Sequence, residues 1–224
     1  MKNFITRKTV NMNPSFKKLI KSCASLIACA AFFYSIPASA AENFAEKYRS
    51  DLAQIETYLN GISNLSAKFT QESSGTLVEG KFYLSRNPES SGKMRIEYST
   101  QPKILIVVNG AVLSYYDVEL DEVSHLSTNT TPASFLTRPN ISFAAKDVEI
   151  TNVKKTADSI KVSVMKKNRK EAGEFSLVFK TNPLRFDKME VKNDLDQIIS
   201  VSLSNMDFNS PISDKLFVIK KPSN

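Results

Sequence analysis

The chain contains a single histidine, His125, and its neighbours include the residue types of a hydrolase site. Ser124 and Ser127 could supply a nucleophile, and Asp121 and Glu122 could supply a carboxylate. A serine–histidine–acid triad requires three side chains that a rigid scaffold brings together. Neighbours within one polar segment seldom reach that geometry, and the chain has no G-x-S-x-G motif. We therefore expect His125 to be a solvated loop residue and the protein not to be an enzyme.

Other catalytic and cofactor chemistries find little support in the sequence. The six glycines form neither a G-x-G-x-x-G motif nor a P-loop. Both cysteines, Cys23 and Cys29, lie near the N-terminus, so a zinc site elsewhere would need mostly carboxylates, which is unusual. Two-carboxylate glycoside hydrolysis stays open because such pairs lie far apart in sequence, but no pattern favours it. The sequence predicts no metal and no cofactor.

The N-terminal segment has the features of a secretory signal peptide. The first 21 residues carry six basic residues and no acid, and an apolar run from Ser22 to Ile36 follows. The triplet Ala38-Ser39-Ala40 resembles a cleavage site. We predict that residues 1–40 are the signal peptide, cleaved after Ala40, and that residues 41–224 form one domain in the periplasm.

Two alternatives to this signal remain. An uncleaved anchor would need a longer apolar run, since a spanning helix takes about 20 residues. A lipid-modified Cys29 is suggested by Leu26-Ile27-Ala28-Cys29, but the chain stays apolar after this cysteine. Cleavage after Ala40 would also change the charge: the net charge of +7 over 224 residues would fall to +1 over the remaining 184. The basic pI then belongs to the signal, so no nucleic-acid partner is expected.

Hydrophobic periodicity predicts one helix followed by many strands. Apolar residues from Phe44 to Ile62 recur at spacings of three and four, which is the pattern of one apolar helix face, and Gly61 is placed to end it. From Leu65 to Tyr98 the period changes to two, as in strands with one buried face. Asn109-Gly110 between two apolar runs predicts a hairpin.

The middle of the chain interrupts the strands. Residues 117–130 are polar and predict an irregular segment, and Thr131-Pro132 predicts a short helix through Phe135 and Leu136. The second half predicts an antiparallel meander with short polar connections. Its strands are expected at residues 146–154, 159–165, 174–180, 184–192, 198–206 and 215–220.

A succession of short motifs gives the sequence a family resemblance. The motifs are Phe69-Thr70-Gln71, then Gly80 to Arg86 with Pro88, Arg95-Ile96-Glu97-Tyr98 with Pro102, Asn109-Gly110 with Tyr115-Tyr116-Asp117, and Thr131-Pro132-Ala133-Ser134-Phe135-Leu136. In this order, behind an export signal, they resemble the periplasmic outer-membrane lipoprotein carrier family of the LolA type. Two features depart from the family pattern: Asn87 separates Arg86 from Pro88, and the chain has no tryptophan.

The resemblance implies a mainly β fold with short helices, an incomplete antiparallel β-barrel closed by an α-helical lid over an apolar cavity. It implies a monomeric carrier without a cofactor, which binds the acyl chains of lipoproteins released from the inner membrane. The donor would be an inner-membrane ABC-type lipoprotein exporter, and the recipient an outer-membrane acceptor. The residues expected to line the cavity are Phe69, Phe82, Leu84, Met94, Ile96, Tyr98, Phe135 and Leu136.

The same resemblance makes Arg86 the latch that holds the lid over the empty cavity. A planar guanidinium with five donors can gather several carbonyl groups at once. The plainer interpretations are that Arg86 is a surface residue at a strand end and that the eight apolar residues fill a core. Two rival functions also remain: a sensor of envelope stress with the same fold, whose known members have an additional domain, and a periplasmic hydrolase that depends on His125.

Overall fold

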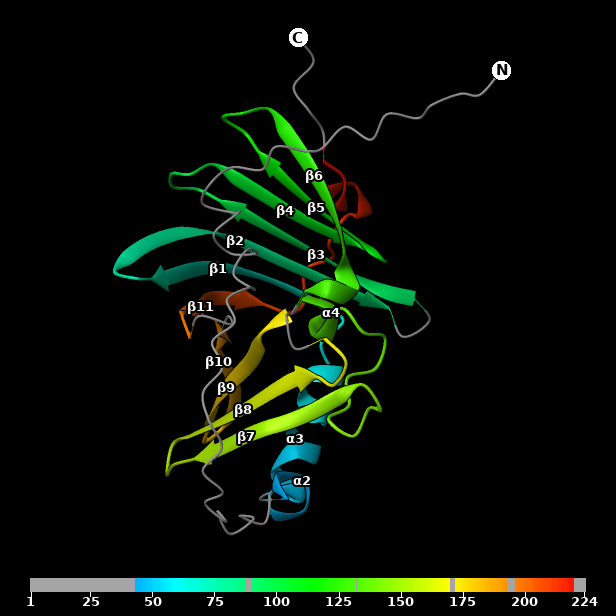
Figure 1. Cartoon of the computed structure of the whole chain (residues 1–224), viewed down its shortest axis with the longest axis vertical. Coiled ribbons are helices and arrows are strands. Elements are labelled where there is room, and N and C mark those ends of the chain that lie inside the picture. Colours follow the sequence, from blue (N-terminus) through cyan, green and yellow to red (C-terminus); the bar gives the residue numbers. More distant parts are fainter. Residues whose placement is uncertain (1–42, 88–89, 132, 170–171, 193–195, 220–224) are drawn as a thin grey trace, which may run out of the picture. The chain divides into compact units, whose positions relative to one another are not determined.

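The computed structural model describes residues 43–87, 90–131, 133–169, 172–192 and 196–219 (Figure 1). The chain divides into two compact units, Met1–Ala41 and Glu42–Asn224, and the described residues belong to the second. The predicted signal peptide therefore lies outside the described residues. Within those residues, every helix is too short or too polar to cross a membrane.

The predicted N-terminal helix forms in two pieces. α2 spans Phe44–Lys47 and α3 spans Arg49–Asn60, because Tyr48 between them leaves the helical conformation, with φ −112° and ψ 23°. α3 buries the predicted apolar stripe through Leu52, Ile55 and Leu59. Gly61 follows as the C-terminal cap, as its position in the sequence predicted.

Eleven strands within the described residues form one antiparallel sheet. The strands are β1 Asn64–Ser73, β2 Thr76–Asn87, β3 Ser90–Tyr98, β4 Ile104–Asn109, β5 Val112–Asp117, β6 Glu122–Ser127, β7 Val148–Lys155, β8 Ser159–Lys166, β9 Glu174–Thr181, β10 Leu184–Lys192 and β11 Ile198–Asp207. Their order is β6-β5-β4-β3-β2-β1-β11-β10-β9-β8-β7. Two meanders are thus joined where β1 pairs with β11.

The long connection between β6 and β7 forms the lid, by which we mean residues 128–147. β6 and β7 are consecutive in the chain but lie at opposite edges of the sheet and do not pair, so the barrel is not closed. The connection, residues 128–147, must travel from one edge to the other, and it carries η1 (Thr128–Thr130) and α4 (Ala133–Leu136). Figure 1 shows α4 in front of the middle strands. The predicted incomplete antiparallel barrel with short helices is confirmed.

Both faces of the sheet carry apolar clusters, of unequal size. The main cluster joins α3 and α4 to strands of both meanders. A second cluster, which covers the opposite face of β4 and β5, consists of Leu105, Val107, Tyr116 and Phe217. Along β4, Val108 belongs to the main cluster whereas Val107 belongs to the second, as the strand period of two requires. β4 is therefore covered on both sides, which explains why its sequence is a continuous apolar run.

Gly80 makes room for one core ring. A Cβ at this position would lie 2.5 Å from the Phe69 ring and 2.1 Å from the Glu97 carbonyl oxygen. Gly80 stands opposite Phe69 on β1 and opposite Tyr98 on β3. The missing side chain lets the Phe69 ring lie over β2 and meet Tyr98 edge-on at 5.2 Å between ring centroids.

The prediction of an irregular polar segment over residues 117–130 is wrong in part. Residues 122–127 form β6, which pairs with β5 along its whole length. β6 lies at the edge of the sheet, and only Val123 and Leu126 of its side chains join the apolar clusters. An edge strand needs little apolar surface, so its sequence lacks the alternation that identifies inner strands.

The predicted strand at residues 215–220 is also wrong. Asp214–Phe217 form the short 3-10 helix η3, and the described residues after it have no regular structure. Phe217 is 1% exposed and packs in the second cluster, on top of β4 rather than beside an edge. A segment that crosses the face of a sheet has no strand partner, so its apolar residues only mimic a strand pattern.

Candidate functional site

The eight predicted cavity residues come together in one place. Phe69, Phe82, Leu84, Met94, Phe135 and Leu136 are buried members of the main cluster, and Ile96 and Tyr98 are half-buried against it. Strand register explains the grouping, because Phe82 stands opposite Ile96 and Leu84 opposite Met94. Cross-strand partners share one face of the sheet, so these side chains point toward the lid side together.

Aromatic contacts hold the lid down on this cluster. The Phe135 ring on α4 lies 5.6 Å from Phe143 and 6.1 Å from Phe175 on β9, measured between ring centroids. The interior beneath α4 is therefore filled by the protein's own side chains. α4 thus packs directly against the main cluster in this structure.

A polar pair stands among the apolar side chains at β1 and β3. The Tyr98 hydroxyl donates a 2.7 Å hydrogen bond to Gln71 Oε1. Burial raises the pKa of Tyr98 to about 12, and the nearby Tyr115 adds to the shift. Tyr98 therefore stays neutral, and its hydroxyl gives this part of the face one fixed hydrogen-bonding position.

Arg86 ties three segments of the chain together beside α4. Its Nη1 donates to the Leu59 carbonyl at 2.6 Å, and its Nη2 donates to Asn60 Oδ1 at 3.0 Å, both at the end of α3. Its Nε donates to the Arg138 carbonyl at 3.2 Å, and its Nη2 also donates to the Pro139 carbonyl at 3.3 Å. Arg86 is 8% exposed, which contradicts the interpretation of a surface arginine.

All four of these Arg86 acceptors are neutral. Burial lowers the pKa of the Arg86 guanidinium, yet an arginine keeps its charge because its ordinary value is so high. A buried charge without a carboxylate among these acceptors depends on the carbonyl dipoles that surround it. If the segment after α4 moved away, Arg86 would lose two of the four acceptors.

Two side chains of α3 strengthen the same connection. Asn60 donates from Nδ2 to the Ile141 carbonyl and accepts from the Ile141 N–H, both at 2.8 Å. Glu56 Oε1 accepts from the Phe143 N–H at 2.5 Å. Sequence patterns gave no signal for either residue, because a polar residue on the outer face of a predicted helix is ordinary.

Gly92 is a further residue that the sequence did not identify. Its N–H donates to the Thr137 carbonyl at 2.7 Å, just after α4. A Cβ here would lie 3.0 Å from Arg86 Cγ and 3.1 Å from the Thr137 carbonyl oxygen. Glycine therefore lets the end of the lid rest on β3 beside Arg86. Pro88, which follows Arg86 in the family motif, lies outside the described residues.

His125 occupies a different face from this site. It lies on β6, exposed, and its Nδ1 is 3.0 Å from Ser114 Oγ on β5. The two residues are directly opposite in the strand register, so the pair is a cross-strand contact. The predicted loop position is wrong, and the neighbouring serine is Ser114 rather than Ser124 or Ser127. Among the described residues, no group of three or more histidine, cysteine or acidic side chains could hold a metal ion.

Comparison with known proteins assigns the family. The profile of the outer membrane lipoprotein carrier protein LolA family matches residues 60–220. The chain belongs to this family. An outer-membrane lipoprotein carrier protein of Coxiella burnetii is 25% identical over 180 residues, which cover 75% of this chain and 81% of that protein. An uncharacterized protein of Rickettsia prowazekii is 24% identical over 172 residues, covering 76% and 77% respectively.

Solved structures with similar folds are more distant. A putative outer membrane lipoprotein-sorting protein domain from Vibrio parahaemolyticus has 9% identity and a TM-score of 0.49, covering 75% of this chain and 94% of that one. A LolA superfamily protein from Nitrosomonas europaea has 12% identity and a TM-score of 0.41, covering 75% and 97%. The family assignment rests on the sequence match and not on these two structures.

Proposed function

We propose that the protein is a periplasmic carrier that binds the acyl chains of lipoproteins released from the inner membrane and delivers them to the outer membrane. The observation that supports this most directly is the set of hydrogen bonds from Arg86. They fasten the segment after α4 to α3 directly beside a large apolar cluster, with bonds that can be exchanged for water when the lid lifts.

The energetics of acyl chains explain why such a closure is useful. Each buried CH₂ group contributes about 0.8 kcal/mol, so several long chains cannot cross an aqueous compartment bare. A carrier must offer a comparable apolar surface and still release its cargo. In the proposed cycle, the eight apolar residues line the open cavity. The closed state, with Arg86 bonded to its four acceptors, competes against the cargo and so favours release.

The proposed partners follow from the family. The donor would be an inner-membrane ABC-type exporter that supplies the work of extraction, and the recipient would be an outer-membrane acceptor. We propose that the carrier acts as a monomer without a cofactor.

Co-purification tests the proposed function. The protein is isolated from the periplasm of cells that make lipoproteins, and mass spectrometry identifies what remains bound to it. We expect acylated lipoprotein at close to one per carrier. An empty protein, isolated under conditions that retain cargo on an established carrier, would contradict the proposal and favour the sensor function.

A further inference from the structure

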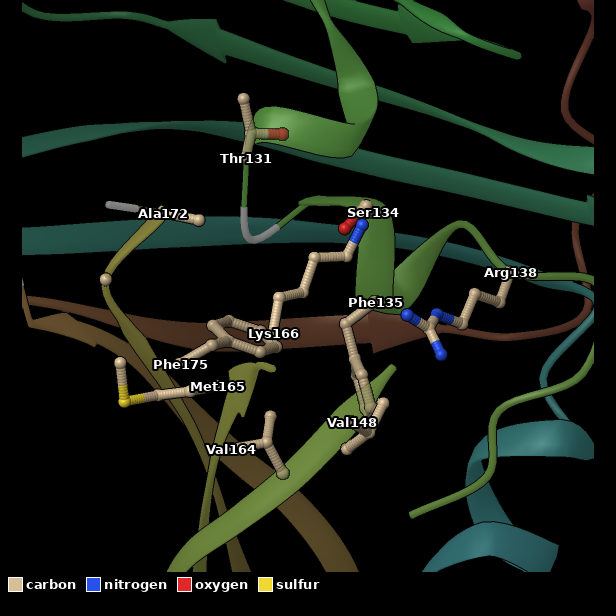
Figure 2. Close-up of a pocket in the computed structure, with 11 residues that line it drawn as sticks. Thr131, Ser134, Phe135, Arg138, Val148, Val164, Met165, Lys166, Ala172 and Phe175 are labelled. Atoms are coloured by element: carbon tan, nitrogen blue, oxygen red, sulfur yellow. The ribbon is translucent and has the colours of Figure 1, made fainter. Parts of the chain in front are cut away.

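One small pocket brings the main cluster to the surface. It lies between α4 and the neighbouring parts of β7, β8 and β9 (Figure 2). The floor of the pocket is apolar and consists of Phe135, Val148, Val164 and Phe175, each no more than 5% exposed. The cavity volume is about 20 Å³, which leaves space for about one water molecule. We call this pocket the mouth, and it is closed in this structure.

Phe135 is the group that closes the mouth. Figure 2 shows its side chain pointing from α4 toward Val148 on β7. The same ring packs against Phe143 and Phe175 and belongs to the main cluster. Because α4 has only four residues, Phe135 can move with it without disturbing a longer helix. A chain that replaced this ring would reach the main cluster directly.

The rim of the mouth is polar and cationic. Thr131 and Ser134 contribute hydroxyl groups, and Arg138 and Lys166 contribute positive charge. In Figure 2 the Lys166 side chain extends from β8 toward Ser134 on α4. An apolar floor beneath such a rim matches an amphiphile whose chain points inward and whose head group stays at the surface.

The two cations of the rim differ in their partners. Arg138 binds Asp147 through both Nη atoms, at 3.1 Å and 2.6 Å. Lys166 Nζ donates to the carbonyl and Oδ1 oxygens of Asn129, at 3.1 Å and 3.3 Å, and both of these acceptors are neutral. Lys166 is therefore the cation of the rim whose hydrogen bonds an incoming anion can replace at low cost.

The surrounding charges also favour an anion at Lys166. Burial lowers the pKa of Lys166, and the charges of Arg138 and Arg169 lower it further, while Asp147 acts in the opposite direction. Two cations and one carboxylate thus act on this ammonium group. Arg138 and Arg169 repel the Lys166 ammonium group and Asp147 attracts it, so an anionic head group would add a second attraction.

We propose that the mouth binds an acyl chain that carries an anionic head group, a carboxylate or a phosphate, with the head on Lys166 and the chain in place of the Phe135 ring. The site rests on the proposed carrier function, since the chain would occupy the same cluster. The proposal adds a class of ligand to the proposed cargo. The lipid group of a lipoprotein is an uncharged glyceride, whereas this ligand carries a negative charge on its head group.

Calorimetric titration with three probes of equal chain length tests the site. The probes are palmitate, 1-palmitoyl lysophosphatidylglycerol and neutral monopalmitoylglycerol, each below its micelle concentration. A hydrogen bond to a charged group contributes about 1.5–3 kcal/mol, so an anion should bind about tenfold or more tightly than the neutral probe. The substitution Lys166→Gln should remove this preference, so that the variant binds all three probes with equal affinity.

Two matched variants separate charge from structure. Lys166→Arg keeps the charge and should keep the preference for anionic probes. Asn129→Ala removes one of the two hydrogen bonds from Lys166 Nζ to Asn129 and should also keep this preference.

A preference confined to palmitate, or to the lysophospholipid, would support the site and identify the carboxylate or the phosphate as its source. Equal binding of all three probes by the unmodified protein would overturn this site and leave the carrier function intact. If Asn129→Ala abolished the preference as Lys166→Gln does, the lysine would be a structural tie and the site would also be overturned. Failure of every probe to bind would count against both proposals.

Discussion

Arg86 Nη1 donates a 2.6 Å hydrogen bond to the carbonyl oxygen of Leu59, across 27 positions of the chain. Leu59 lies in the last turn of α3, and its carbonyl also accepts from the Ile62 N–H at 3.2 Å. Arg86 therefore adds a second donor at the end of α3 while its other donors reach Arg138 and Pro139 after α4. One side chain couples the N-terminal helix to the lid, and this coupling motivates the first two predictions.

Replacing Arg86 by leucine should shift the lid toward its open state. We expect the free energy of closure to fall by about 2 kcal/mol, which corresponds to about thirtyfold tighter retention of cargo. Arg86→Leu should load lipoprotein but transfer it poorly to an acceptor, measured with purified donor and acceptor fractions. Arg95→Leu is the control, since Arg95 donates to Leu216 and to Glu97 instead. Normal transfer by Arg86→Leu would show that Arg86 is not a latch.

Gly92→Val should loosen the same contact without removing the arginine. The new side chain would press on Arg86 Cγ and the Thr137 carbonyl, which an added Cβ already meets at 3.0 Å and 3.1 Å. We expect retention and transfer to change as in Arg86→Leu. The double variant should add little, because neighbouring residues of one contact are not additive. Ser91→Val, at the exposed neighbouring position, is the control. If the effects of Gly92→Val and Arg86→Leu on retention and transfer were fully additive, the two residues would not act through the same contact.

Ile96→Glu should separate a cavity from a core. Ile96 is half-buried, so a carboxylate there can reach water and the protein should remain folded by circular dichroism. Binding of acyl chains should be lost, measured as lipoprotein recovered with the purified carrier. Val123→Glu places the same charge against the second cluster, on the other face, and should retain cargo. An Ile96→Glu protein that does not fold would indicate that this residue only fills a core.

Stability at alkaline pH should depend on Tyr98. The folded protein raises its pKa to about 12, above an ordinary value of 10.0. A raised pKa means that the folded state favours the protonated phenol, so its contribution to stability is complete below pH 10 and is lost as the pH rises toward 12. Urea unfolding at pH 8 and pH 11 measures the loss. Tyr98→Phe should show a smaller loss than the unmodified protein, and equal losses would contradict the shift.

Removing the His125 side chain should leave transport unchanged. Its Nδ1 contacts Ser114, and both residues lie outside the main cluster. His125→Ala and Ser114→Ala should therefore deliver lipoprotein at the rate of the unmodified protein in the same transfer assay. Abolished function in both variants would instead support the hydrolase hypothesis.

Local features of the fold follow from sequence patterns alone. Apolar residues that recur with a period of two predicted most strands, and apolar residues at spacings of three and four predicted α3. Asn109-Gly110 predicted a hairpin, which the structure confirms between β4 and β5. These features are local because burial on one face of an element repeats with the period of that element. The motif around Arg86 also identified the residue that proved to be buried beside the lid.

Which distant groups meet depends instead on how the whole chain packs. The pairing of β1 with β11 and the separation of β6 from β7 force residues 128–147 across the sheet, and no periodicity encodes that path. The acceptors of Arg86 come from segments 27 and 52 positions away, and Gly92 matters because Thr137 rests on it. A carbonyl group and an absent Cβ carry no sequence pattern, so their roles appear only when the chain is packed.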